Sequence, residues 1–373
     1  MLENIKIRNF RNLTNYETNL NQGVTTLIGR NGVGKSSLIE AIYFLSIGRS
    51  FRARHDRDTI NKNIIGSGDF AQIKGTITSI NQIKELQVVL NLDESSKLSK
   101  NGNINGANTK LSEFVGNLKS VCFSVNDMDV IFGSPSERRK YMDLLNTQLT
   151  SNYTSELLTY NNVINSRNAL LKRIKFNEAN KEELDYWNEK MLDIGSFIIQ
   201  NRYQSLQQLN SISNDIFVKI FNSEHEGEIQ YLPSLDFDDN FQFDIEFIRD
   251  HFKSQLLESE MKDISYGRST IGPHRDDILI TIDGGIAQNF ASRGQARLLV
   301  LGIKLAECEL IKQSNEEPII LLDDAFSELD FKNQEYLAKF ILDYNQCLIT
   351  GLDFSVVKNM GIHTNDIVMG EYD

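Results

Sequence analysis

The chain has 373 residues, a formal net charge of −12 at pH 7 and 40% hydrophobic residues. This length exceeds one typical domain and the composition is ordinary for a globular protein, so we expect one large lobe and one smaller lobe. The sequence has no run of about eighteen apolar residues and does not open with a basic segment followed by an apolar one, which argues against a membrane span and a signal peptide. Cys122, Cys308 and Cys347 lie far apart in apolar runs, which predicts buried thiols in the reducing cytoplasm rather than disulfides or zinc.

The first predicted elements surround a glycine-rich loop. Ile5, Ile7 and Phe10 alternate with charged residues, which predicts an edge strand. Residues 24–28 form a β-branched run of strand length, and residues 37–45 carry apolar side chains at helical spacing. A strand therefore enters the loop and a helix leaves it.

The loop itself, residues 29–36, matches the phosphate-binding pattern Gly-x4-Gly-Lys-Ser/Thr at all four fixed positions. Its glycines allow a tight turn in which backbone N–H groups and the following helix N-terminus face phosphates. Lys35 would reach the β- and γ-phosphates, and the Ser36 hydroxyl would complete a Mg²⁺ shell. A glycine-rich surface turn is the alternative, but the motif and both flanking elements favour a nucleotide site. The predicted nucleotide-binding residues are Gly29, Arg30, Asn31, Gly32, Val33, Gly34, Lys35, Ser36 and Ser37.

A basic stretch and a β layer follow the helix of the loop. The basic stretch occupies residues 49–57. Strand-type alternation then runs through residues 71–80 and 85–92, and Asn101-Gly102 predicts a two-residue hairpin turn. These segments predict an antiparallel layer, and residues 120–124 add one short, buried strand.

From Ser136 to about Lys262 the sequence is mostly helical in character. Pro135 followed by Ser136-Glu137 is typical of a helix start, and long helices are expected over residues 141–171 and 182–221. Apolar residues keep a heptad spacing only from Leu184 to Ile198, which indicates helices packed in a compact subdomain rather than a long coiled coil.

Strand character returns near the C-terminal end. Residues 278–282 predict a strand, and residues 296–310 form a strongly apolar helix. Residues 319–322 are a fully apolar run of the kind found in parallel sheets. Residues 346–350 and 367–369 predict two further strands.

Two acidic residues, Asp323 and Asp324, come directly after the predicted strand at 319–322. Strand ends of this kind meet ligands at the C-terminal edge of a parallel sheet. We therefore predict that Asp323 holds Mg²⁺ and that Asp324 polarises the attacking water. A pair of helix-capping aspartates is the alternative, but a cap would not need a buried strand before it.

The tetrapeptide Ser292-Arg293-Gly294-Gln295 stands immediately before the predicted helix at 296–310. A hydroxyl, a glycine that permits close approach and a helix N-terminus together make an anion site. The tetrapeptide precedes the strand that ends in Asp323-Asp324, in a protein that also has a phosphate loop. This order of motifs resembles that of the signature and Walker-B motifs in the ABC ATPases. Residues 327–330 resemble their D-loop.

Several longer motifs carry a closer resemblance, which runs from end to end of the chain. The segments are residues 9–13, 29–36, 50–52, 133–143, 272–277, 292–295 and 321–330. Together they are similar to the RecF recombination-mediator family. Residues 133–143 and 272–277 are the most specific of them, because general ABC proteins lack both.

The resemblance implies an α/β fold: an ABC-type, SMC-like ATPase head with an antiparallel β layer (1–135 plus 262–373) and a mainly helical second lobe (136–261). It implies ATP and Mg²⁺ as cofactors and an ATP-dependent homodimer with ATP held between the subunits. Lys35, Asp324 and Ser292 would then be catalytic in a weak, DNA-stimulated ATPase. Signature residues Ser292, Arg293, Gly294 and Gln295 would act on the nucleotide of the partner subunit.

The same resemblance implies partners and a location. Members of the family bind single- and double-stranded DNA without sequence preference and work with RecO and RecR to load recombinase at gapped DNA. We therefore expect a cytoplasmic, nucleoid-associated protein with no membrane partner. Within this frame Ser124-Val125-Asn126-Asp127 departs from the usual Q-loop segment, and Thr350-Gly351 lacks a switch histidine, which leaves the γ-phosphate sensor unassigned.

Candidate DNA contacts come from basic clusters, although each cluster by itself is more typical of a solvated face than of a DNA contact. Residues 221–248 contribute −8 to the net charge, so we expect that acidic segment to face away from DNA. Whether residues 272–277, with His274, touch nucleotide, DNA or only the lobe interface is open. The first candidates are Arg52, Arg54 and Arg57, the second are Arg138, Arg139 and Lys140, and Arg167 with residues 172–175 forms a third group.

Other classes of protein fit less well. A long-armed SMC protein is excluded because only residues 136–261 could form an arm, which leaves another SMC-like repair ATPase with a short helical arm as the alternative. An ABC transporter subunit would need a membrane partner and a shorter gap between Ser36 and Asp323. A passive DNA scaffold with a vestigial site is disfavoured by the intact Lys35 and Ser292.

Overall fold

The computed structural model describes residues 1–79, 82–93, 97–237, 244–314, 316–351 and 354–370. The chain divides into two compact units, one made of residues 1–128, 219–223 and 293–373 and the other of residues 129–218 and 224–292. Within the described ranges, no helix combines the length and the apolar character needed to cross a membrane. Of the acidic segment at 221–248, residues 238–243 lie outside the described part of the chain.

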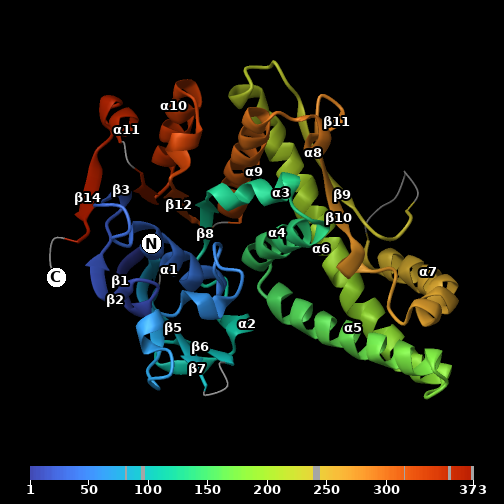
Figure 1. The fold of residues 1–373 in the computed structure, drawn as a ribbon. Helices are drawn as coiled ribbons and strands as arrows, with labels where there is room; N and C mark the ends of the chain where they lie inside the picture. Colours follow the sequence, from blue (N-terminus) through green and yellow to red (C-terminus); the bar gives the residue numbers. More distant parts are fainter. Residues whose placement is uncertain (80–81, 94–96, 238–243, 315, 352–353, 371–373) are drawn as a thin grey trace. The chain divides into compact units, whose positions relative to one another are not determined.

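The first unit contains two β-sheets of different kinds (Figure 1). One sheet is parallel throughout, with five strands in the order β14-β3-β13-β12-β8. The other is antiparallel, with six strands in the order β2-β1-β4-β5-β6-β7. Strand β1 lies between two neighbours, so the predicted edge strand is wrong. The bounds are β1 Leu2–Phe10, β2 Leu13–Asn19, β3 Gly23–Ile28, β4 Ala71–Ser79, β5 Gln82–Leu92, β6 Leu98–Ile104, β7 Ala107–Thr109, β8 Ser120–Phe123, β12 Ile319–Asp323, β13 Gln346–Thr350 and β14 Thr364–Val368.

Helix α1 (Lys35–Ile47) is buried between the two sheets. It contacts β8, β12 and β13 of the parallel sheet and β1, β4 and β5 of the antiparallel sheet. Every residue from Ser37 to Ile47 is buried, which explains why the helix is apolar around most of its circumference. The phosphate loop is therefore anchored to the core on both sides. The other helices of this unit are α2 (Leu111–Phe114), α9 (Arg293–Gln313), α10 (Phe331–Phe340) and α11 (Ser355–Asn359).

The hairpin predicted at Asn101-Gly102 is wrong, because both residues lie inside strand β6. The chain turns at Asn105-Gly106 instead, where φ is 51° and 85°, the left-handed region that such turns require. Gly102 serves packing, since a Cβ at this position would lie 3.0 Å from the side chain of Phe114. Of the two Asn-Gly pairs, Asn105-Gly106 forms the turn, and Asn101-Gly102 stays in the strand, where Gly102 packs against Phe114.

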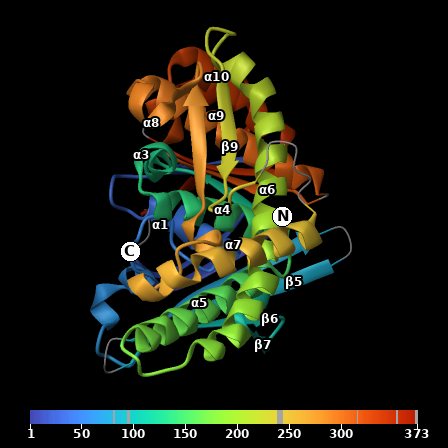
Figure 2. The ribbon, with the colours of Figure 1, turned by 90° about the vertical axis from the view of Figure 1, so that its right-hand side faces the viewer.

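The second unit is mainly helical and carries a three-stranded antiparallel sheet in the order β11-β10-β9. Helix α5 packs against α7 (Figure 2). The bounds are α3 Asp129–Phe132, α4 Pro135–Leu149, α5 Tyr153–Lys175, α6 Leu184–Ile220, α7 Ile245–Tyr266, α8 Ala287–Phe290, β9 Gly227–Leu232, β10 Asp277–Ile282 and β11 Gly285–Ile286.

The long predicted helices are confirmed with one interruption. Helix α4 begins at Pro135 as expected, but it ends at Leu149 and α5 starts at Tyr153. Thr150 is extended at this break (φ −123°, ψ 117°), and its hydroxyl donates a hydrogen bond to Asn201 Oδ1 at 2.9 Å. Thr, Ser and Asn side chains favour such breaks because they offer hydrogen bonds outside the helix. Helix α6 runs without a break over 37 residues.

The boundaries of the compact units differ from the domain boundaries expected from the sequence. Residues 262–292, expected in the head, belong to the helical unit. The physical reason is strand pairing: Asp277–Ile282 pairs with Gly227–Leu232 from the helical segment. The functional division into an ATPase head (1–135 plus 262–373) and an insertion (136–261) stays a prediction.

Candidate nucleotide-binding site

The phosphate loop connects β3 to α1 and requires glycine at two tight positions. At Gly29 a Cβ would lie 2.7 Å from the Met369 carbonyl oxygen, and at Gly34 it would lie 2.6 Å from Leu13 Cδ2. Gly34 also has φ of 120°, which side chains rarely adopt. The motif therefore has this sequence because the backbone passes close to neighbouring segments.

The charged residue of the loop is held inside it. The Lys35 ammonium group donates hydrogen bonds to the carbonyl oxygens of Gly29 at 2.6 Å and Arg30 at 3.3 Å. Lys35 begins α1, so its charge lies where the helix N-terminus and the loop N–H groups gather. This arrangement keeps the ammonium group within the loop that would receive phosphates.

A cavity of about 570 Å³ opens next to the loop. This volume is in the range of small-molecule sites. Among the predicted nucleotide-binding residues, Gly29, Arg30 and Val33 are not part of its described lining. The cavity is lined by Asn12, Asn31, Gly32, Gly34, Lys35, Ser36, Ser37, Arg52, Val125, Asp324, Ser327, Thr350 and Gly351.

The two predicted acidic residues lie at the end of β12, as the sequence indicated. Asp323 is the last residue of the strand, and Asp324 follows in a left-handed conformation with φ of 57°. Asp324 lines the cavity. Thr350, at the end of the neighbouring strand β13, donates a hydrogen bond to Asp323 Oδ1 at 2.9 Å and accepts one from the Asp324 N–H at 3.1 Å.

Asn12 is a site residue whose role sequence reasoning missed. Its amide group donates to the Gly32 carbonyl at 2.8 Å, and its oxygen accepts from the Ser37 hydroxyl at 2.7 Å. The side chain thus connects the middle of the phosphate loop to the first turn of α1. Its place in the motif at 9–13 was the available signal, but the spacing does not reveal the contact.

The basic stretch is anchored to α1 through a buried carboxylate. Glu40 is fully buried, and Arg11 donates to both its oxygens, at 2.6 and 2.9 Å. Ser50 also donates to Glu40 and accepts from the N–H groups of Arg52 at 2.9 Å and Ala53 at 2.7 Å. The start of the stretch is therefore fixed to the helix that follows the phosphate loop.

This anchoring changes the assignment of Arg52. The sequence placed it first among the DNA contacts, but it lines the nucleotide cavity. Arg54 and Arg57 are exposed in the same stretch. Residues 124–127, which depart from the usual Q-loop segment, also reach the cavity. Val125 lines the cavity, and the Asn126 amide donates a hydrogen bond to the Phe51 carbonyl at 3.2 Å.

The donor set fits Mg²⁺ held together with a nucleotide. Ser36 and Asp323 offer hydroxyl and carboxylate oxygens, the ligands Mg²⁺ prefers, and it is usually bound by one or two protein groups plus phosphates. In the described part of the chain, no group of three or more His, Cys, Asp or Glu side chains could hold a metal ion. Ser36 lines the cavity, whereas Asp323 is not among its lining residues, so the assignment of these two residues as Mg²⁺ ligands stays a prediction.

The signature tetrapeptide lies at the start of α9. The helix begins at Arg293, and Ser292, Arg293 and Gly294 are exposed. Gln295 is half-buried. This exposure is compatible with the predicted contact to a second subunit.

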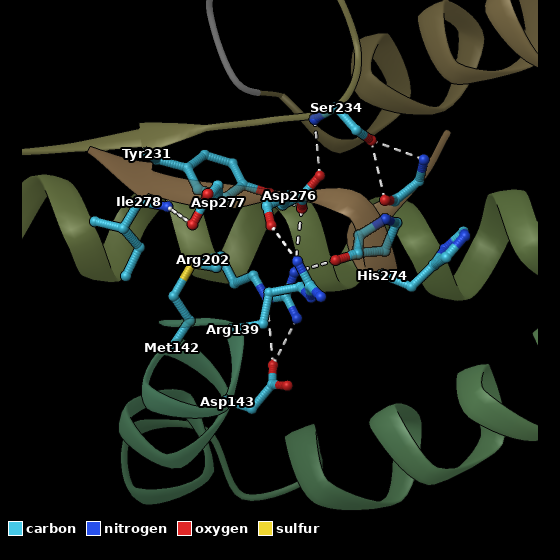
Figure 3. Close-up of polar contacts among 12 residues, drawn as sticks. Arg139, Met142, Asp143, Arg202, Tyr231, Ser234, His274, Asp276, Asp277 and Ile278 are labelled. Atoms are coloured by element: carbon cyan, nitrogen blue, oxygen red, sulfur yellow. Dashed lines mark hydrogen bonds and ion pairs between the residues drawn. The ribbon is translucent and has the colours of Figure 1, made fainter. Parts of the chain in front are cut away.

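Residues 272–277 form the polar centre of the helical unit (Figure 3). Asp276 is fully buried and accepts hydrogen bonds from Tyr231, from the Ser234 N–H at 2.8 Å and from Arg202 at 3.1 Å. Arg202, only 2% exposed, also pairs with Asp143 at 2.8 Å. The motif thus connects α4, α6 and the sheet of this unit.

His274 belongs to the same buried region. Its Nδ1 lies 2.9 Å from the Tyr160 hydroxyl. Burial lowers the pKa of His274 to about 4, and the charges of Arg275 and Arg139 act in the same direction. The imidazole is therefore neutral at physiological pH.

Three arginines of the second and third groups of DNA candidates are engaged inside the helical unit, whereas Lys172, Arg173 and Lys175 of the third group are exposed. Arg138 forms a two-pronged ion pair with Asp277, at 2.6 and 2.7 Å, and this pair raises the pKa of Arg138. Arg139 donates to the Asp276 carbonyl at 3.0 Å. Arg167 is completely buried. These three side chains do not fit the predicted DNA contact because their charges are used inside the unit.

Taken together, a parallel sheet carries the phosphate loop and an acidic strand end, and an antiparallel layer and a helical unit accompany it. These features define an ABC-type ATPase head of the SMC kind. The family model described as "RecF/RecN/SMC N terminal domain" matches residues 1–371. A solved SMC head bound to the C-winged helix domain of ScpA has the same fold, with a TM-score of 0.52 at 15% identity over 96% of this chain and 91% of that chain.

Closer relatives specify the family. The DNA replication and repair protein RecF of Oenococcus oeni is 36% identical over 362 residues, covering 96% of this chain and 94% of its own length. RecF of Bacillus thuringiensis is 34% identical and covers 100% and 99%. A solved structure of the recombination mediator RecF with ATP has a TM-score of 0.85 at 30% identity, covering 99% of this chain and 97% of that one. The chain belongs to the RecF family, which confirms the resemblance drawn from its motifs.

Proposed function

We propose that this protein is an ATP-dependent DNA-binding recombination mediator with weak, DNA-stimulated ATPase activity. One observation carries the proposal: a single cavity is lined by the phosphate loop, by Asp324 and by Thr350, which is hydrogen-bonded to Asp323. A relative of the same family has been solved with ATP.

The residues divide the chemistry among them. Lys35 leaves its loop carbonyls and contacts the β- and γ-phosphates, as in other phosphate-loop proteins. Ser36 and Asp323 are the ligands for Mg²⁺, which supplies charge neutralisation at the phosphates when bound. Asp324 is placed on the cavity wall and orients the attacking water. A shorter carboxylate than the usual Glu fits slow hydrolysis.

The active species that we propose is an ATP-dependent homodimer. Ser292, Arg293 and Gly294 lie exposed at the N-terminus of α9, where hydroxyl, backbone N–H groups and helix dipole favour an anion. In the dimer these residues complete the γ-phosphate shell of the partner subunit, with Ser292 contributing to catalysis there.

The proposed partners are DNA, RecO and RecR. Arg54, Arg57 and Lys140 remain candidates for backbone contacts because their side chains are exposed or partly exposed. Lys172, Arg173 and Lys175 of the third group are exposed as well and remain candidates too. Contacts of this type hold single- and double-stranded DNA without reading sequence. With RecO and RecR the protein would load recombinase at gapped DNA, in the cytoplasm at the nucleoid.

ATP turnover measured with and without DNA tests the proposal. Replacing Lys35 by Ala removes a charge–phosphate contact on the order of 2–5 kcal/mol, so ATP affinity should fall at least about 30-fold. Lys332→Ala, at an exposed position of α10, is the matched control and should bind ATP normally. Wild-type turnover in Lys35→Ala would refute the site.

A further inference from the structure

Thr350 occupies the place where the sequence left the γ-phosphate sensor unassigned. It is the last residue of β13, directly opposite Asp323 in the parallel register between β13 and β12. The side chain is only 1% exposed, yet the residue lines the nucleotide cavity. A polar group thus stands between the sheet core and the site.

The single hydroxyl of Thr350 makes two close hydrogen bonds with different tasks, and the Leu322 carbonyl oxygen lies farther from it, at 3.5 Å. Its proton goes to Asp323 Oδ1 at 2.9 Å, which fixes one carboxylate oxygen of the predicted magnesium ligand. Its oxygen accepts the Asp324 N–H at 3.1 Å. The two acidic residues of the site are therefore held by one atom of a neighbouring strand.

The second bond supports an unfavourable backbone conformation. Asp324 has φ of 57° and ψ of 20°, a left-handed geometry that is unfavourable for a non-glycine residue and persists only when its surroundings hold it. The hydrogen bond to Thr350 is one of those constraints. It sets the direction in which the chain leaves β12 and hence where the Asp324 side chain enters the cavity.

We infer that Thr350 is a positioning residue for the Asp323-Asp324 pair, which holds the Asp323 carboxylate for magnesium and orients Asp324. The inference rests on the proposed MgATP function of the site and assigns no contact between Thr350 and nucleotide. Partners that orient a metal ligand in this way typically change metal affinity or activity by about 10- to 100-fold when they are removed.

The test compares Thr350→Val, which keeps the shape and removes the hydroxyl, with Thr350→Ser, which keeps the hydroxyl. The Mg²⁺ concentration that gives half-maximal binding of a fluorescent ATP analogue should rise about 10-fold or more in Thr350→Val. Binding of the analogue in EDTA should be unchanged, because Lys35 and the loop remain. Thr350→Ser should stay near wild type in both measurements. If Thr350→Val fails to fold, Thr350→Ala, which also lacks the hydroxyl, makes the same test.

Thr26→Val is the matched control. Thr26 is also 1% exposed, lies in the adjacent strand β3 and donates to a carboxylate, Asp366, outside the cavity. Its replacement should leave the Mg²⁺ midpoint unchanged, so a general effect of losing a buried hydroxyl is separated from positioning.

Three outcomes are distinguishable. An unshifted Mg²⁺ midpoint in Thr350→Val, with a normal magnesium response in the wild type, would overturn the inference and leave the proposed function intact. A wild-type protein without any magnesium-dependent nucleotide binding would overturn the proposed function and the inference together. A midpoint shifted equally in Thr26→Val would also count against positioning by Thr350.

Discussion

Three arginines from basic clusters have three different environments. Arg52 lines the candidate nucleotide cavity, Arg138 forms a bidentate ion pair with Asp277, and Arg167 is fully buried. A positive residue in a basic cluster is typical of a solvated surface, but the partner that neutralises it can be a distant part of the chain. At the level of single residues, charge alone therefore did not locate the DNA contacts.

The neutral His274 makes stability depend on pH. Its folded-state pKa of about 4 lies below the ordinary value of 6.5, so the unfolded chain binds the proton more tightly. Stability from this group is present above about pH 6.5 and is lost as pH falls towards 4, by up to about 3 kcal/mol. Urea unfolding at several pH values measures it.

The variant His274→Asn isolates this contribution. It should lose less stability than the wild type between pH 6.5 and 4, while other titrating groups affect both proteins equally. His363→Asn, at an exposed position, serves as control and should follow the wild type. Parallel stability curves for wild type and His274→Asn would contradict a buried neutral imidazole.

The helices of the second unit are joined by ion pairs that differ in burial. Arg167 of α5 and Asp263 of α7 meet at 2.7 Å with both side chains 0% exposed. Asp263 also accepts two hydrogen bonds from Thr270, at 2.6 and 2.9 Å. By contrast, Glu189 of α6 and Arg249 of α7 meet at 2.6 Å at the surface. Geometry is similar in both pairs, but burial is not.

We predict that burial decides the energetic effect of these pairs. Asp263→Asn leaves the Arg167 charge buried without its counterion and should lower the free energy of unfolding by about 3–5 kcal/mol. Glu189→Gln, which breaks the surface pair, should cost about 1 kcal/mol or less. Denaturant unfolding followed by circular dichroism tests both; equal losses would show that burial is not the deciding factor.

At the level of the whole molecule, the proposed dimer can be tested by mixing two inactive variants. Ser292→Arg should bind ATP but stay monomeric in light scattering, and Lys35→Ala should not hold ATP. A heterodimer of the two has one composite site with both defects and one with neither. Random pairing should therefore restore about a quarter of wild-type turnover. No recovery at any mixing ratio would argue against a site shared between subunits.

The proposed DNA contacts can be tested through the salt dependence of DNA binding. If Arg54 and Arg57 each contact one phosphate, a dimer uses four such contacts. Replacing both by Ala should then flatten the dependence of log affinity on log salt by about 3–4 units, with ATP affinity unchanged. Salt titrations of DNA binding at saturating ATP give the slope.

Arg52→Ala separates the two roles of the basic stretch. Because Arg52 lines the cavity, this variant should weaken ATP binding more than it changes the salt slope. An unchanged slope in the Arg54/Arg57 double variant would move the DNA surface elsewhere, with Lys140 and the exposed Lys172, Arg173 and Lys175 as the next positions to test.

Local patterns were sufficient to predict where the segments of the candidate nucleotide site lie. The loop at 29–36, the acidic end of β12 and the start of α9 are each contiguous in sequence, so spacing and residue type predicted them directly. The strands and helices of the core were also predictable because their apolar periodicity reports one buried face. The RecF resemblance rested on the same short motifs and was confirmed by the comparisons.

Only the tertiary structure decided which distant side chains meet. Thr350 reaches Asp323 across 27 residues of chain, Asn12 holds the phosphate loop, and Arg202 connects Asp143 with Asp276. Packing against Phe114 likewise determined which of two Asn-Gly pairs forms the turn. Such contacts depend on strand register and helix packing, which arise from many weak interactions over the whole core, and no local pattern of residues contains them.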